Sequence, residues 1–104
     1  MEKAETKKMP LSEILQVLRG LKDEIRRKYR AEIRGVFGSY VRGEQEAGSD
    51  LDVLVEFDPG ANLLDLTGLA LALEEKLNLP VDVVPESAIR DEIKETILME
   101  KVPV

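Results

Sequence analysis

The sequence predicts a single small α+β domain built as two layers, with helices packed on a sheet. A chain of 104 residues suits one domain, which we expect to span 1–104 with residues 1–9 as a flexible tail. Long stretches with helical apolar spacing alternate with short runs rich in β-branched residues. The resulting order is α-β-α-β-α-β-α, without an internal repeat or an interdomain linker.

Composition excludes several kinds of chemistry. The chain has no cysteine and no histidine, so it cannot supply thiol catalysis, a Cys/His zinc site or a Ser-His-Asp triad. No apolar run approaches the ~20 residues of a membrane span and no signal peptide is visible, so we expect a cytoplasmic protein. Residues 35–104 hold fifteen acidic against five basic residues, which argues against a nucleic-acid substrate.

In the first half of the chain, we expect a helix over 11–30, started by Pro10 or Ser12. A strand over 31–38 follows, and a second helix can begin at Ser39. The apolar stripe of the first helix consists of Leu11, Ile14, Leu15, Leu18, Leu21, Ile25 and Tyr29.

The second half contains the clearest strand, 50–57, followed by a helix over 63–79. A strand over 80–85 is bounded by prolines, a final helix covers 86–101, and 102–104 is expected to be a tail. The expected buried face of the 63–79 helix consists of Leu63, Leu66, Ala70, Leu73 and Leu77.

Two acids stand at the entrance of the 50–57 strand. Asp50 and Asp52 are two residues apart, so their side chains point to one face, about 7 Å apart at Cα. Like charges at this separation repel unless a cation or water screens them. An isolated pair of this kind is also typical of a solvated strand end, and both readings stay open.

A third acid, Asp82, lies among valines in the 80–85 strand. If the two strands are neighbours, Asp82 joins Asp50 and Asp52, and three carboxylates form a site suited to Mg²⁺. The alternative is a solvent-facing residue on an edge strand. Gly38 and Ser39 offer a close backbone approach and a hydroxyl beside free N–H groups, suited to phosphate, although Ser39 is also a plain helix N-cap candidate. Together these features predict a site for a nucleoside triphosphate with magnesium.

The spacing of these residues is similar to that of a known family. Gly38-Ser39, ten intervening residues, Asp50-x-Asp52 and a downstream Asp82 resemble the DNA polymerase beta-like nucleotidyltransferase superfamily. The stretches "GSYVRGE" and "SDLDVLVEF" look most like its minimal nucleotidyltransferase branch, whose members act as antitoxins to HEPN-domain toxins. The resemblance implies the nucleotidyltransferase fold, a small mixed sheet with helices on one face.

The resemblance also implies roles for the site residues. Asp50 and Asp52 would bind two Mg²⁺ ions, with Asp82 completing the catalytic one, and Gly38 and Ser39 would hold the triphosphate of ATP. Arg42 could pair with the γ-phosphate, although an ion pair with Glu44 or Glu46 is an equal alternative.

The implied activity is transfer of AMP from ATP to a tyrosine of a HEPN-domain partner encoded by the adjacent gene, which silences that partner's RNase activity. A non-catalytic binding antitoxin and transfer to a small-molecule hydroxyl are the alternatives. Two surface features stay open between solvation and partner contact: the leucines Leu64 and Leu71, and the basic cluster Arg26, Arg27, Lys28 and Arg30.

Overall fold

A computed structural model describes residues 9–46 and 48–104 of the chain. The expected order of helices and strands is confirmed, with two additions near the C-terminus, η1 and β4. The elements are α1 (Leu11–Tyr29), β1 (Ala31–Phe37), α2 (Ser39–Arg42), β2 (Leu51–Phe57), α3 (Leu63–Leu77), β3 (Val81–Pro85), the 3₁₀ turn η1 (Glu86–Ala88), α4 (Asp91–Glu100) and β4 (Val102–Pro103).

The strands form one mixed sheet in the order β3-β2-β1-β4. β1 pairs antiparallel with β2 and with β4, whereas β2 and β3 are parallel and are joined through α3. A parallel pair requires such a crossover, because the chain must return to the same end of the sheet. The crossover therefore brings the starts of β2 and β3 together, and the predicted acids lie there.

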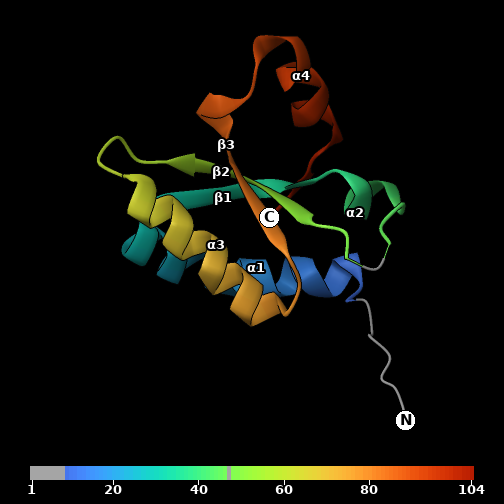
Figure 1. Cartoon of the computed structure of the whole chain (residues 1–104), viewed down its shortest axis with the longest axis horizontal. Coiled ribbons are helices and arrows are strands. Elements are labelled where there is room, and N and C mark those ends of the chain that lie inside the picture. Colours follow the sequence, from blue (N-terminus) through green and yellow to red (C-terminus); the bar gives the residue numbers. More distant parts are fainter. Residues whose placement is uncertain (1–8, 47) are drawn as a thin grey trace.

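Helices α1 and α3 cover one face of the sheet, and α4 stands over the opposite face (Figure 1). On β2, Leu51, Val53 and Val55 are fully buried and belong to the main core between the sheet and these two helices. Alternation along a strand therefore turns Asp52 and Leu54 toward the α4 side. The expectation of helices on one face holds for α1 and α3, and α4 is the exception.

The stripe predicted for α1 is confirmed: Ile14, Leu15, Leu18 and Ile25 are buried. The stripe predicted for α3 is partly wrong. Its buried residues are Leu69, Leu73 and Leu77, whereas Leu63 is 73% exposed. The first turn of α3 extends past the edge of the core. Helical periodicity therefore predicts burial of Leu63 where no other part of the described chain covers it.

The C-terminal segment differs most from the prediction. The expected tail is strand β4, which pairs with Gly35 and Val36 of β1. The expected final helix divides into η1 and α4, and α4 has no buried residue. Hydrogen bonding to a free sheet edge orders the tail, a long-range contact that local pattern does not reveal.

The expected N-terminal tail largely falls on residues 1–8, outside the described residues, while Met9 packs against the core. Within the described ranges, no helix has the length and apolar character that a bilayer span requires.

Candidate active site

Asp52 and Asp82 occupy matching positions on the parallel strands β2 and β3. Paired residues of neighbouring strands point to the same face, with backbones about 5 Å apart. The prediction that Asp82 joins the acids of β2 on one sheet face is therefore confirmed for Asp52. Asp52 is half-buried and Asp82 is exposed, so the pair opens to solvent on the α4 side.

Asp50 directly precedes β2 and is exposed. Across the described part of the chain, no three acidic side chains are close enough to make a ready metal site. The assignment of Asp50, Asp52 and Asp82 as metal ligands stays a prediction.

The electrostatics of Asp52 fit a cation site. Burial, together with the charges of Asp82 and Asp50, raises the pKa of the Asp52 carboxyl from 3.8 to about 6, against a smaller opposing effect of Arg42. Carboxylate oxygens are the ligands that Mg²⁺ prefers, and a bound divalent cation would offset this repulsion. The donor set therefore suits Mg²⁺.

Gly38 forms the turn between β1 and α2, next to Asp52. Its φ of 85° lies in a region that residues other than glycine rarely adopt, and a Cβ here would overlap Oδ2 of Asp52. Gly38 is the N-cap of α2 and Ser39 is its first residue, so the alternative in which Ser39 is the cap is wrong. Because α2 has only four residues, any anion bound here depends on individual N–H groups and the hydroxyl rather than on a helix dipole.

Arg42 is held between two carboxylates. Its Nε donates to Glu44 at 2.9 Å, as the alternative reading anticipated, and its Nη1 donates to Glu100 at 3.0 Å. Glu100 also accepts a 3.4 Å hydrogen bond from the backbone N–H of Gly38. Sequence reasoning missed Glu100, which lies at the end of α4. The only available signal was an acid ending a helix, and that pattern is too common to be informative.

The basic cluster at the end of α1 is largely engaged within the chain. Arg26 lies 3.6 Å from Glu32 and 3.7 Å from Asp58. Lys28 pairs with Glu24, and Arg30 donates to the carbonyl of Gly60. These contacts agree with the reading of a solvated, dipole-complementing helix end.

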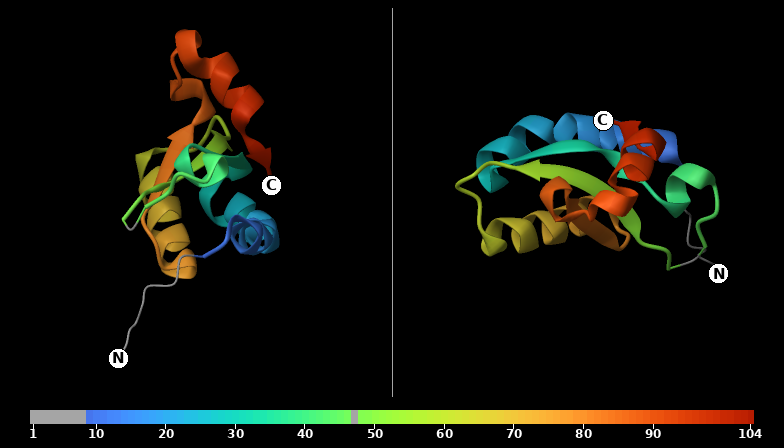
Figure 2. Two further views of the ribbon diagram at one scale, coloured as in Figure 1. Left: turned by 90° about the vertical axis from the view of Figure 1, so that its right-hand side faces the viewer. Right: turned by 90° about the horizontal axis from the view of Figure 1, so that it is seen from above.

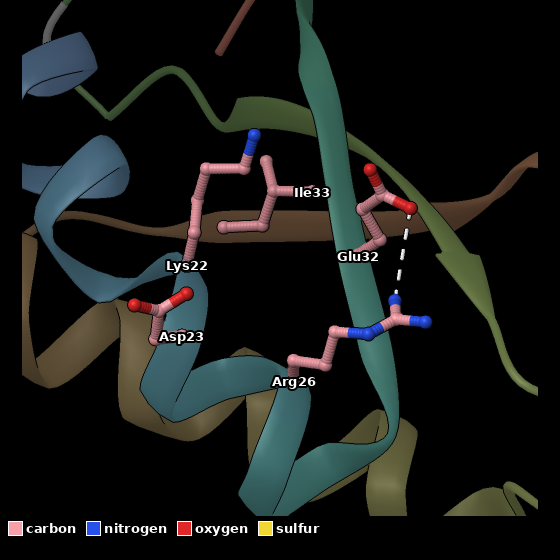
Figure 3. Close-up of a pocket in the computed structure, with 5 residues that line it drawn as sticks. All are labelled: Lys22, Asp23, Arg26, Glu32 and Ile33. Atoms are coloured by element: carbon pink, nitrogen blue, oxygen red, sulfur yellow. Dashed lines mark ion pairs between the residues drawn. The ribbon is translucent and has the colours of Figure 1, made fainter.

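A hollow beside this cluster is lined by charged groups and Ile33 (Figure 3). Arg26 and Glu32 pair across it, and Lys22 donates to the carbonyl oxygen of Val104. Glu32 pairs with Glu56 in the sheet register, at the opposite end of β2 from Asp52. The hollow is therefore separate from the candidate active site.

Residues 18–104 match the family described as "Nucleotidyltransferase domain". The chain is 42% identical over 94 residues to the protein adenylyltransferase MntA of Thermococcus cleftensis, covering 90% of this chain and 95% of MntA. It is 46% identical over 77 residues to a Methanocaldococcus jannaschii protein that is named provisionally as a protein adenylyltransferase, covering 74% of this chain and 83% of that protein.

Two solved structures are similar. One, described provisionally as a minimal nucleotidyltransferase, has a TM-score of 0.71 at 39% identity, covering 86% of this chain and 95% of that one. The other, titled as a toxin-antitoxin with AMP-PNP, has a TM-score of 0.63 at 22% identity, covering 78% and 67%, and shows the fold alone. The predicted resemblance is confirmed. The chain belongs to the nucleotidyltransferase domain family, and its enzyme class is nucleotidyltransferase.

Proposed function

We propose that this protein transfers AMP from ATP to a tyrosine hydroxyl of a HEPN-domain partner and thereby silences that partner's RNase activity. One observation carries the proposal: Asp52 is paired with Asp82 on the neighbouring strand and lies against the Gly38 turn. The residues proposed to hold the cations and those proposed to bind the triphosphate therefore adjoin. Relatives named as protein adenylyltransferases, and a neighbour titled as a toxin-antitoxin, agree with a protein acceptor.

In this proposal the backbone N–H of Gly38, the hydroxyl of Ser39 and the guanidinium of Arg42 hold the triphosphate. Asp50, Asp52 and Asp82 would hold two Mg²⁺ ions, and these ions would supply positive charge for the phosphates and a lowered pKa for the acceptor hydroxyl. The acceptor oxygen bonds to the α-phosphorus, the bond between the α- and β-phosphates breaks, and pyrophosphate leaves. The hydroxyl proton passes to solvent.

The described chain consists of the sheet and the helices that support it. The excess of acidic over basic residues in residues 35–104 favours a protein acceptor over a nucleic acid. The partner must therefore bring its own docking surface and place its hydroxyl over the exposed side of Asp82.

The test incubates the protein with α-labelled ATP and Mg²⁺, with and without the protein encoded beside it, and compares wild type with Asp52→Asn. Label on the neighbour that is lost in the variant supports the proposal. Glu56→Gln is the matched control, because Glu56 follows on the same strand but pairs with Arg34. Absence of label, with toxin neutralisation that survives Asp52→Asn, would instead identify a binding antitoxin.

A further inference from the structure

The C-terminal end of α4 returns to the candidate active site. Figures 1 and 2 show α4 standing over the sheet and descending toward the end of β1, where β4 joins the sheet edge. Glu100, the last residue of α4, has a side chain only 26% exposed. Its carboxylate receives hydrogen bonds from the N–H of Gly38, the N-cap of α2, and from Arg42, the last residue of α2.

These two donors are the groups that the proposed function assigns to the triphosphate. A carboxylate and a phosphate are both anions that accept from N–H groups, and Gly38 has one backbone N–H to give. Arg42 also donates its Nε to Glu44, so both Nε and Nη1 are engaged in carboxylate contacts. A triphosphate bound at this turn must therefore replace Glu100 at Gly38.

The contact is electrostatically favourable. The hydrogen bond from Arg42, with a smaller contribution from Gly38 N–H, lowers the pKa of Glu100. The Glu100 side chain can leave its donors without opening the core, because none of the side chains of α4 is buried. Another anion can therefore compete with Glu100 for the same donors.

We infer that Glu100 is an internal competitor of the nucleotide: its carboxylate occupies the phosphate-binding groups until the triphosphate displaces it. This inference rests on the proposed function, since it concerns regulation of the same site. In this role Glu100 lowers the affinity for the nucleotide, whereas the aspartates serve the transfer reaction itself.

The test measures binding of inorganic tripolyphosphate, with Mg²⁺, to wild type, Glu100→Gln and Glu100→Ala by calorimetry. Both variants should bind about two- to fivefold more tightly, the range expected from loss of one partly exposed ion pair. Glu44→Gln is the matched control, because Glu44 neutralises the same arginine at 2.9 Å but has no contact with Gly38 among the described hydrogen bonds. Its effect should be smaller.

A second readout follows the backbone amide of Gly38 by NMR in the absence of ligand. Its proton resonance should shift in Glu100→Gln and stay in place in Glu44→Gln. Equal or weaker tripolyphosphate binding by the Glu100 variants, or no binding to any form, overturns the inference. Failure of AMP transfer from labelled ATP, with the affinity difference intact, would instead overturn the proposed function alone.

Discussion

Asp52 and Asp82 occupy paired positions on two parallel strands, although the residues are thirty positions apart in the chain. The parallel crossover through α3 sets this register, and the neighbouring Gly38 turn borders it. One end of a small sheet therefore concentrates negative charge beside the turn that we propose binds the triphosphate. This arrangement suits a reaction that brings a metal and a phosphate together.

Substitution of either paired aspartate should abolish transfer without unfolding the protein. We expect Asp52→Asn and Asp82→Asn each to lower the rate of AMP transfer by about 100-fold or more, since each removes a carboxylate that would hold the metal ions beside the reacting phosphate. The measurement is label transfer under single-turnover conditions. Retained activity in Asp82→Asn would remove that residue from the site.

The raised pKa of Asp52 predicts a pH-dependent stability. Between pH 3.8 and about 6 the folded metal-free protein holds a proton on Asp52 that the unfolded chain releases. Binding of this proton stabilises the folded protein. The stabilisation is complete at low pH and is lost as pH rises through about 6. Asp52→Asn should therefore match wild type near pH 3.5 and exceed it at pH 7 by on the order of 1 kcal/mol, allowing for solvent screening. Urea unfolding at several pH values measures the difference.

Magnesium should offset the same repulsion. We expect Mg²⁺ to raise the thermal unfolding midpoint of wild type at pH 7.5, because it binds the folded acid cluster and not the unfolded chain. The rise should vanish in the double variant Asp52→Asn/Asp82→Asn and persist in Glu56→Gln. Equal rises in all three proteins would place the bound ion elsewhere.

The backbone of Gly38 should not tolerate a side chain. Gly38→Ala adds a Cβ at φ 85° that overlaps Asp52, so we expect a loss of about 1–3 kcal/mol in the free energy of unfolding and weaker triphosphate binding. Gly20→Ala is the control, since nothing lies within 4 Å of the added atom. This helical substitution should stabilise the protein by about 0.5–1 kcal/mol. Chemical denaturation compares the two.

Substitution of buried and of exposed leucines on α3 should have clearly different effects on the free energy of unfolding. Leu73 is fully buried, and Leu73→Ala should cost about 2–5 kcal/mol of stability. Leu64 is 80% exposed, and Leu64→Ala should change stability by less than about 0.5 kcal/mol. A large loss for Leu64→Ala would show that this leucine is covered in solution, and sedimentation would then identify the covering copy or partner.

The sequence by itself determined the local features of this protein. Short-range periodicity decides which residues of α1 face the core, and strict alternation on β2 turns Asp52 away from the core that Val53 enters. The spacing of Gly38-Ser39, Asp50-x-Asp52 and Asp82 was enough to predict the family, which the match over residues 18–104 confirms.

Only the tertiary structure decided the features that join distant segments. The parallel register of Asp52 with Asp82, the pairing of β4 with β1, and the contact of Glu100 with Arg42, 58 positions away, each depend on where the whole chain packs. Local propensity carries no information about such partners, because an acid at a helix end or a valine near the terminus looks the same whether or not another segment reaches it. The burial of α3 also depends on tertiary structure: the leucine periodicity includes Leu63, but the core does not reach that residue, which is exposed.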